Sequence, residues 1–454
     1  MADIKALFAA DGALAQAVRD YQPRPGQQEL AEAVADNVSD DGILLAEAGT
    51  GTGKTFAYLL PLLASGKKGL VSTATRNLQE QIFTKDLPLV RKVLRSTARV
   101  ALLKGRRNYL CHHHYHQYLD SEPHTAEEKA WRRAIERFFD KTADGDLVAL
   151  TEIPEDAPVL ARITSTAENC LGRDCAFFEE CFVQQARQKA KEADVTIINH
   201  HLLLADFALK SEGFAEILPD IQAFVIDEAH HLPLTAIHFL GDRLSARQLL
   251  GFISDGEAAA LAEAPDALEL RETLRELKLQ HSKILLAVRQ PTETRLDEEQ
   301  LFAHRAFWTE LQALAALFEL LHIQLAPQKA RGKLLAHLDG RCQDLQKLLA
   351  AFLAEDRAAL PAATEKTGND AENNDKPPVP RAIWLDVGPR HYTLCSVPVN
   401  AAGRFASWIA NSNASWAFLS ATLAVNGNFA HYARELGLRP VGTGADEGVA
   451  RGGG

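Results

Sequence analysis

The sequence predicts an α/β protein built on a parallel β-sheet. Six short apolar runs rich in branched residues end in loop signals: Ile43–Ala46, Gly69–Thr73, Arg99–Leu103, Val195–Asn199, Ala223–Ile226 and Trp416–Leu419. Continuous apolar strands of this kind are typical of a parallel sheet that is covered on both faces. Helical patterns separate several of the runs, as expected when parallel strands are joined by helices. A glycine-rich loop follows the first run, where such sheets bind ligands.

Length and composition set broad limits. A chain of 454 residues corresponds to two to four domains. Its hydrophobic content of 46% and charged content of 24% are typical of a soluble globular protein. No run of 18 apolar residues is present, so no membrane span is expected. The first residues carry Asp3 and Asp11 and do not read as a signal peptide, which favours the cytoplasm.

Two long stretches interrupt the sheet pattern and define the expected domains. Residues 105–192 are rich in Cys, His and charge, and residues 232–355 read almost entirely as helices. We therefore expect one sheet domain from 1–104, 193–231 and 381–435, interrupted by a cysteine-rich domain at 105–192 and a helical domain at 232–380. The polar stretch 362–380 predicts a linker, and the Gly-rich residues 436–454 predict a disordered tail.

The leucine spacing in the second stretch favours a helix that packs in a core more than a partner-binding face. The leucines with this spacing are Leu268, Leu270, Leu274, Leu277 and Leu279.

The segment Ala48–Thr55 matches a phosphate-binding loop, with Ala in place of the usual first Gly. Small residues let backbone N–H groups surround phosphates at the start of a helix. Lys54 would place a cation on the β- and γ-phosphates, and the Thr55 hydroxyl would bind Mg²⁺. The expected nucleotide-binding residues in this loop are Ala48, Gly49, Thr50, Gly51, Thr52, Gly53, Lys54 and Thr55.

An apolar strand ends in two acids within Val225–His230. Asp227 would hold Mg²⁺, directly or through water. Glu228 would orient and activate the attacking water. The sequence therefore predicts an ATP- and Mg²⁺-dependent site with Lys54, Asp227 and Glu228 at its centre.

Charge is unevenly distributed along the chain. The formal net charge is −11, yet the stretch 85–107 holds eight basic residues against the single acid Asp86. A local basic stripe can bind nucleic-acid phosphates in an acidic protein, although a solvated helix face would look the same. The basic residues are Lys85, Arg91, Lys92, Arg95, Arg99, Lys104, Arg106 and Arg107.

Four of the six cysteines are clustered as Cys111, Cys170, Cys175 and Cys181, with 58, 4 and 5 residues between them. Four thiolates bind either zinc or an iron–sulfur cluster, and spacing alone leaves both open. The lone first cysteine favours a cluster, because zinc sites usually have paired cysteines at both ends. Four histidines after Cys111 could serve as alternative ligands, but we expect them to be solvated helix residues, because the cysteines already complete a set of four. They are His112, His113, His114 and His116. Cys342 and Cys395 are expected to be small buried residues.

Several short motifs resemble those of superfamily 2 helicases. Asp227–His230 resembles the Asp-Glu-Ala-His box, and His230 would couple the nucleotide site to the Ser-Ala-Thr motif at Ser420–Thr422. The segment Tyr21–Gln27 resembles the Q motif, in which Arg24 and Gln27 would contact adenine. Ser72–Thr75 with Gln79 resembles motif Ia, which lines single-stranded DNA in these enzymes.

The cysteines lie between motif Ia and the Asp-Glu-Ala-His box, as in the DinG/XPD-type helicases, and the chain resembles their bacterial YoaA-like branch most. The resemblance implies a [4Fe-4S] cluster on the four cysteines, a motor domain with an inserted cluster domain and an inserted helical arch domain, and an ATP-dependent DNA helicase of 5′-to-3′ polarity. Such an enzyme would act on single-stranded or forked DNA in repair or replication. In the lead-in to Cys111, Arg106 and Arg107 would contact phosphates and Tyr109 would stack on a base or pack. Asn199–His201 resembles a further short motif.

One expectation limits activity. The family carries a second motor domain with a Gln-x-x-Gly-Arg-x-x-Arg pattern, which this sequence lacks. Its arginines are worth ~10³–10⁵ in rate. The chain would therefore be a truncated product that binds ATP–Mg²⁺ and turns it over slowly. The alternatives are a non-motor ATP- and DNA-binding fragment, or a redox-responsive DNA-binding protein.

Overall fold

The computed structural model describes residues 3–19, 21–49, 51–123, 125–211, 218, 220–288, 294–359, 381–389, 391–398, 402–438 and 449–452. They fall into two compact units. Unit 1 comprises Met1–Ser165, Phe177–Phe239 and Asn400–Gly454, and unit 2 comprises Thr166–Ala176 and Leu240–Val399. The expected linker at 362–380 lies outside the described residues.

Unit 1 contains a mixed α/β fold whose sheet has the order β11-β1-β10-β5-β2-β4-β3. All neighbours from β1 to β3 pair in parallel, and β11 pairs with β1 antiparallel. The six expected parallel strands are thus confirmed. Their bounds are β1 Ile43–Glu47, β2 Gly69–Thr73, β3 Val100–Leu102, β4 Val195–Asn199, β5 Ala223–Asp227 and β10 Ser415–Ser420.

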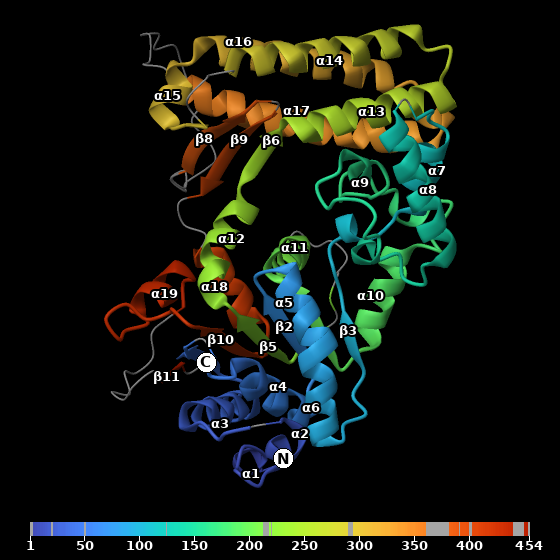
Figure 1. Ribbon diagram of the computed structural model, residues 1–454. Helices are drawn as coiled ribbons and strands as arrows, with labels where there is room; N and C mark the ends of the chain where they lie inside the picture. The colour runs from blue at the N-terminus through green and yellow to red at the C-terminus, as the bar shows by residue number, and fades with distance from the viewer. Residues whose placement is uncertain are drawn as a thin grey trace. The chain divides into compact units, whose positions relative to one another are not determined.

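Helices cover both faces of this sheet (Figure 1). On β10, Ala417 and Leu419 face a core that includes α3 and α4, whereas Trp416 and Phe418 face a core that includes α11 and α18. The same alternation on β1 and β5 makes both faces apolar, which explains the continuous apolar runs. The helices of unit 1 are α1 Ile4–Leu7, α2 Ala13–Ala17, α3 Pro25–Asp40, α4 Lys54–Ser65, α5 Arg76–Gln81, α6 Leu87–Leu94, α7 His112–Leu119, α8 Ala126–Lys141, α9 Pro158–Arg162, α10 Phe182–Glu192, α11 His200–Ser211, α18 Ala402–Asn411 and α19 Ala430–Glu435, with a π-helical turn η1 at Ile82–Asp86.

Unit 2 combines long helices with a small antiparallel sheet of order β6-β9-β8-β7. The helices are α13 Ala246–Glu263, α14 Leu268–Val288, α15 Glu298–Ala303, α16 Arg305–Leu325 and α17 Lys333–Ala359; α12 Leu232–Leu240 precedes them. The strands are β6 Asp242–Ser245, β7 Arg295–Leu296, β8 Arg381–Gly388 and β9 His391–Pro398. No helix among the described residues is long and apolar enough to cross a membrane.

The expected return to the sheet domain at residue 381 is wrong. Strands β8 and β9 pair with each other and belong to unit 2, which extends to Val399. Buried and partly exposed residues alternate along β8, the period of a half-buried antiparallel strand. This alternation in RAIWLDVG was the signal that identifies a hairpin rather than a buried parallel strand.

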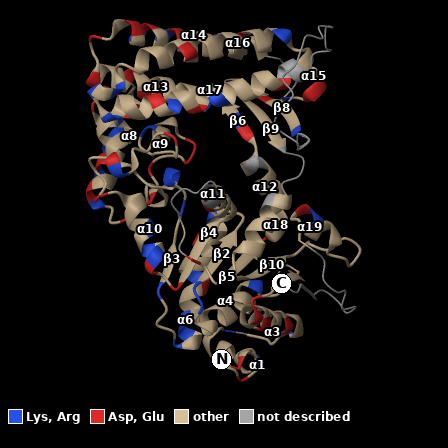
Figure 2. Cartoon of the chain, turned by 180° about the vertical axis from the view of Figure 1, so that it is seen from behind, with Lys and Arg blue, Asp and Glu red and all other residues tan. Residues whose placement is uncertain are grey.

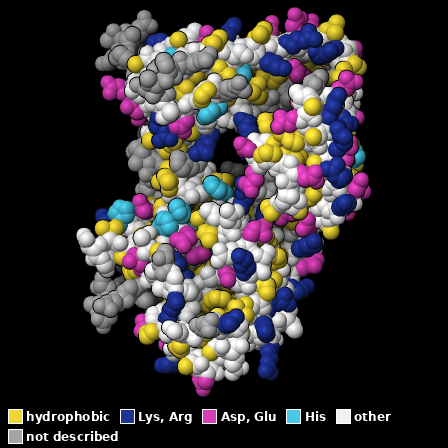
Figure 3. Space-filling model, viewed as in Figure 1, with side chains coloured by type: hydrophobic (Ala, Val, Ile, Leu, Met, Phe, Trp, Pro, Cys, Tyr) yellow, Lys and Arg dark blue, Asp and Glu magenta, His cyan; other side chains and the backbone are white. Residues whose placement is uncertain are grey.

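The leucines of α14 divide between the core and the surface. Leu270, Leu274 and Leu277 are buried, as expected. Leu268, Leu279 and Leu286 lie on one stripe of the helix, because 11 and 18 residues are close to whole numbers of turns. They remain 64–69% exposed, and apolar side chains are visible on this layer in Figure 3.

The disordered tail expected at 436–454 needs correction at the seven described residues, 436–438 and 449–452. Leu436 and Leu438 are buried in the core beside the sheet. Val449–Gly452 form β11, which pairs with Ile43–Ala46 of β1. The physical reason is that β1 would otherwise present unpaired backbone groups at the sheet edge. The remaining tail residues from 439 to 448, together with 453 and 454, lie outside the described residues.

The cysteine-rich stretch 105–192 has an apolar cluster of its own, which includes Leu110, Tyr115, Ile135 and Phe182. It is not separated as an independent unit, since most of it lies in unit 1 and Thr166–Ala176 lies in unit 2. Its attachment to the sheet includes Lys104, whose ammonium group pairs with Glu80 on α5 and with Asp146. The side chain of Lys104 is 1% exposed, so this cation lies inside the protein and does not reach solvent.

We predict that Lys104→Met destabilises the folded chain. It leaves the Glu80 and Asp146 carboxylates without their buried cation, which costs ~3 kcal/mol for pairs of this kind. Urea unfolding followed by circular dichroism measures the effect. Lys92→Met, at an exposed position, is the matched control and should stay within about 0.5 kcal/mol of wild type. Equal unfolding midpoints for both variants would contradict the prediction.

Candidate functional site

The loop between β1 and α4 has the backbone geometry of a phosphate-binding loop. Gly51 and Gly53 adopt φ of +78° and +82°, a conformation that residues other than Gly rarely adopt. A Cβ on Gly53 would lie 2.1 Å from Gln27 Nε2, so a larger residue does not fit there. Thr52 Oγ1 donates to the Gly49 carbonyl at 2.8 Å. Thr50, also expected in this loop, lies outside the described residues.

Gln27 supports this loop from α3. It is buried, and its Nε2 donates to the Gly53 carbonyl at 3.0 Å. Arg24, which immediately precedes α3, is exposed. The structure therefore places Gln27 against the loop backbone, while adenine contacts by Arg24 and Gln27 stay a prediction.

The acidic box lies across from the loop at the same edge of the sheet. Lys54 Nζ is 3.4 Å from Glu228 Oε1, and Glu228 has a left-handed backbone with φ of 52°. Asp227 is the last residue of β5 and is buried. The strands that lead to Lys54 and Asp227 are not neighbours, however, because β10 lies between β1 and β5. Chain order did not reveal this, since β10 follows β5 by nearly 190 residues.

Tyr58 joins the two expected Mg²⁺ residues. Its hydroxyl donates to Asp227 Oδ2 at 3.4 Å and also interacts with Thr55, one turn earlier on α4. Burial raises the pKa of Asp227 to about 6, with Glu228 adding to the rise and Lys54 opposing it. A buried carboxylate beside a second carboxylate and a hydroxyl is an oxygen donor set that suits Mg²⁺. The residues present therefore fit this ion.

The Asp-Glu-Ala-His box and the Ser-Ala-Thr motif are in direct contact. His230 Nδ1 lies 2.7 Å from Ser420 Oγ, at the carboxyl end of β10. Glu47, at the end of β1, accepts from the backbone N–H groups of Leu423 and Ala424 at 2.7 and 2.6 Å. Sequence reasoning missed Glu47. Its position directly before the phosphate loop could have indicated that it belongs to the site.

The segment resembling motif Ia is largely buried. Ser72, Thr73 and Gln79 have no exposed surface. Thr75 is exposed and caps α5 by accepting from Leu78 N. A direct contact of Ser72, Thr73 or Gln79 with DNA would need a different arrangement. The exposed residue of this motif is Thr75, and the next two residues, Arg76 and Asn77, are exposed as well.

Only some cations of the basic stripe at 85–107 are exposed. Lys92, Arg95, Arg99 and Arg107 are exposed, and Figure 2 shows Lys and Arg along α6, β3 and α10. Lys104 is buried and cannot reach a phosphate. Tyr109 is 4% exposed and its hydroxyl accepts from Lys104 N, so it packs rather than stacking on a base.

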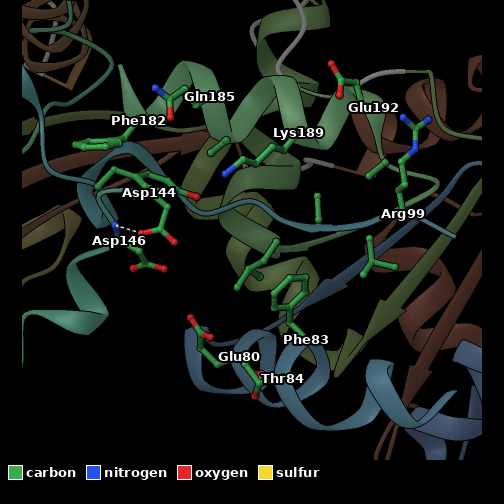
Figure 4. A pocket seen from close by; sticks show the side chains of 16 residues that line it. Glu80, Phe83, Thr84, Arg99, Asp144, Asp146, Phe182, Gln185, Lys189 and Glu192 are labelled. Carbon is green, nitrogen blue, oxygen red and sulfur yellow. Dashed lines mark hydrogen bonds between the residues drawn. The ribbon is translucent and has the colours of Figure 1, made fainter. Parts of the chain in front are cut away.

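A cavity of about 440 Å³ lies beside this stripe and was not expected from the sequence. In Figure 4, Glu80, Phe83 and Thr84 line one side, and Phe182, Gln185 and Lys189 of α10 line the other. Asp144, Asp146, Arg99 and Glu192 complete a wall of mixed charge.

The four expected cluster ligands are all partly exposed, whereas Cys342 and Cys395 are buried, as expected. Cys111 and Cys181 belong to unit 1, and Cys170 and Cys175 belong to unit 2. Cys111 is the N-cap residue of α7, and Cys181 is the N-cap residue of α10. In the part of the chain that the structure describes, no group of three or more Cys, His, Asp or Glu side chains has the geometry of a metal site.

A parallel sheet with a phosphate loop facing an Asp-Glu-Ala-His box defines a nucleotide-binding domain of the helicase type. Consistently, residues 24–109 match the DEAD/DEAH box helicase family. The chain is 35% identical to the ATP-dependent DNA helicase YoaA of Haemophilus influenzae and 36% identical to that of Escherichia coli, in each case over 95% of this chain and 64% of the relative. The chain is therefore similar to the ATP-dependent helicases named YoaA and DinG.

More distant similarities cover less of the relatives. The ATP-dependent helicase DinG of Mycobacterium tuberculosis is 38% identical over 48% of this chain and 36% of its own length. A solved structure named XPD_Helicase covers 92% of this chain and 61% of its own, at 15% identity and a TM-score of 0.44. The chain spans 64% of the length of each of the two YoaA relatives.

We predict a pH-dependent stability difference between wild type and Asp227→Asn. The pKa of Asp227 is about 6 in the folded chain and 3.8 ordinarily. The Asp227 carboxyl therefore binds its proton more tightly in the folded chain than in the unfolded chain. The free energy of unfolding therefore falls as pH rises from about 4 through 6. Without Mg²⁺ and nucleotide, Asp227→Asn should be more stable at about pH 7.5, by at most about 3 kcal/mol. Thermal unfolding across pH measures this, and a difference that does not change with pH would contradict it.

Proposed function

We propose that this chain provides the ATP-binding part of an ATP-dependent DNA helicase that acts in DNA repair or replication. The observation that carries the proposal is the pairing of Lys54 with Glu228, beside the buried Asp227, at one edge of a parallel sheet. The similarity to the YoaA and DinG proteins, which are named ATP-dependent helicases, supports it. Residues 105–192 would form the cluster domain and residues 232–380 most of the arch domain.

The chemistry follows from the charges at this edge. Backbone N–H groups of the loop from Gly51 to Lys54 would hold the β- and γ-phosphates at the start of α4. Lys54 would exchange its Glu228 partner for a phosphate oxygen, which leaves the Glu228 carboxylate to accept a proton from the attacking water. Thr55 and Asp227 would hold Mg²⁺, which neutralises phosphate charge when bound.

His230 would transmit the loss of the Lys54–Glu228 pair to the Ser-Ala-Thr motif. Its ring lies 3.5 Å from a Glu228 oxygen and 2.7 Å from Ser420 Oγ. Loss of the Lys54–Glu228 pair therefore alters a carboxylate that His230 already contacts. Ser420 lies at the end of β10, so the change reaches the centre of the sheet.

The DNA substrate is proposed from the resemblance and from exposed charge. Lys92 on α6 and the cations Arg95, Arg99 and Arg107 around β3 are exposed. With the exposed residues 75–77 they would offer phosphate contacts for single-stranded or forked DNA. The 5′-to-3′ polarity and a cytoplasmic location remain predictions of the sequence.

A [4Fe-4S] cluster on Cys111, Cys170, Cys175 and Cys181 is part of the proposal. All four thiols are partly exposed, and Cys111 and Cys181 stand at the starts of α7 and α10. Binding of the cluster would contribute to the folding of residues 105–192.

The nucleotide prediction compares Lys54→Ala and Glu228→Gln with wild type. Lys54→Ala should lower the affinity for ATP–Mg²⁺ by ~10- to 150-fold, the loss of a hydrogen bond to a charged group. Glu228→Gln should still bind ATP–Mg²⁺ but turn it over ~10²–10⁴-fold more slowly. Isothermal titration and phosphate release measure the two effects. Lys141→Ala, exposed at the end of α8, is the control; unchanged affinity in Lys54→Ala would refute the site.

The cluster prediction compares Cys175→Ser with Cys395→Ser. Wild-type chain purified without oxygen should be brown and contain about four iron and four sulfide. Cys175→Ser should lose both, whereas Cys395→Ser, at a buried cysteine in unit 2, should retain them. Stoichiometric zinc without iron would overturn the assignment.

A further inference from the structure

Most of the large apolar side chains that stay exposed among the described residues lie on the helices of unit 2, whereas the nucleotide site lies in unit 1. They are Leu250 and Leu261 of α13, Leu268, Leu279 and Leu286 of α14, and Leu320 and Ile323 of α16. Apolar side chains are visible on this layer in Figure 3. Exposed apolar residues that gather on one surface indicate an interaction site, whereas scattered single residues do not.

Helix α16 carries a regular part of this surface. Six exposed residues, which we call the α16 seam, follow one another at intervals of three, four, three, four and three residues. They are Ala306, Thr309, Ala313, Ala316, Leu320 and Ile323. This is the heptad spacing of helices that pack against each other in a coiled coil. A face turned only to solvent would carry charged residues, and none of the six is charged.

The two flanks of the α16 seam differ. On one flank, Glu310 Oε2 accepts from Gln280 Nε2 at 2.7 Å, so this side of α16 packs against α14. The other flank is exposed, and it holds three polar residues that are seven residues apart: Arg305, Gln312 and Glu319. The face of α16 opposite the seam is buried in the core of unit 2, through residues that include Leu311, Phe318 and Leu325. The seam is therefore an outer face with one polar flank open to a partner.

The intervals of the seam read the same from either end. A second copy of α16 that runs in the opposite direction therefore meets all six residues in register. The facing pairs are Ala306 with Ile323, Thr309 with Leu320, and Ala313 with Ala316. The outer pairs each combine a small residue with a large one, an arrangement that lets facing helices interdigitate. Alanines on both sides of the two-fold axis let the two backbones approach closely at the centre.

Charge on the exposed flank is self-complementary in the same arrangement. In an antiparallel pair each flank meets the same flank of the other helix, so Arg305 lies opposite Glu319 of the second copy and Gln312 meets its own copy at the axis. Arg305 Nε donates to the Phe302 carbonyl at 3.0 Å, and a guanidinium with five N–H donors can form an ion pair as well. Charged pairs on such flanks set the partner and the direction of paired helices.

We propose that the α16 seam is a self-association surface, through which two copies of this chain pair as an antiparallel, two-fold symmetric dimer. A second copy is the occupant because the intervals of the seam and the charges of its flank both match themselves when reversed, as a contact between identical surfaces requires. A partner of another sequence would require neither property. The seam spans about 26 Å of helix, so the interface is small and the dimer depends on concentration.

The test is analytical ultracentrifugation of the full chain at roughly 1 to 100 µM, a range that covers weak association. A reductant is present so that the partly exposed cysteines do not cross-link the chains. The mass of wild type should rise from one chain towards two across this range. Ala313→Glu puts a charge beside the two-fold axis and should stay monomeric throughout. Ala351→Glu, the same change at an exposed position of α17, is the matched control and should associate like wild type.

Exchange of charges tests the direction of the pairing. Arg305→Glu and Glu319→Arg each set like charges opposite one another at both ends of the interface, and each should raise the dissociation constant about 10-fold. The double variant Arg305→Glu/Glu319→Arg restores both pairs and should return the constant close to the wild-type value. In a parallel pair the double variant would not recover, because residue 305 would then lie opposite Glu310.

The outcomes are distinct. A dimer that is lost in Ala313→Glu and recovered in the double charge variant supports the inference, and thermal unfolding confirms that each variant is folded. If Ala313→Glu does not fold, the charge exchange decides. Wild type that stays monomeric at about 100 µM, a dimer that persists in Ala313→Glu, or a double variant as weak as the single ones overturns the inference. ATP binding is measured separately, so the proposed function stands or fails independently.

Discussion

The pairing of β10 between β1 and β5 is the constraint on which the site depends. Its register sets Ser420 opposite Glu47 and Leu419 opposite Asp227, so three motifs from distant parts of the sequence share one sheet edge. Asn37 Nδ2 reinforces the strand by donating to the Trp416 carbonyl at 3.2 Å. Buried apolar side chains on both faces of β10 stabilise this position, because any shift by one residue would exchange the two cores.

The charges at that edge come from Lys54 and the two acids of the Asp-Glu-Ala-His box. Burial disfavours two ionised carboxylates there, which is why the pKa of Asp227 rises. Phosphates that draw Lys54 away would increase the negative charge, and a divalent cation would compensate for it. The site is therefore arranged to accept an anion and a metal ion together, and His230 contacts both Glu228 and Ser420.

Local patterns predicted the local structure well. The six parallel strands and the phosphate loop followed from continuous apolar runs and small residues, since burial on two faces leaves a mark in the sequence. The pairing of β10 with β1 and β5 did not follow, because strand order depends on packing between residues far apart in the chain. The sequence placed Lys104 among the cations of the basic stripe. In the structure, its ammonium group instead pairs with Glu80 and Asp146 inside the protein.

The same contrast holds for the motif residues. Lys54, Glu228, His230 and Ser420 meet as their motifs suggested, whereas Ser72 and Gln79 are buried where surface contacts were expected. A motif identifies residue types at a given spacing but not their exposure. The four cysteines show the limit most clearly, because their spacing predicts a cluster while the described side chains do not assemble a metal site.

A crystal structure of the chain with Mg²⁺ and a non-hydrolysable ATP analogue tests the central claim most directly. The account predicts β- and γ-phosphates over the backbone N–H groups from Gly51 to Lys54, with Lys54 Nζ on a phosphate oxygen and no longer on Glu228. Mg²⁺ should lie between Thr55 and Asp227. Nucleotide bound elsewhere, or Lys54 still paired with Glu228 beneath bound phosphates, would contradict it.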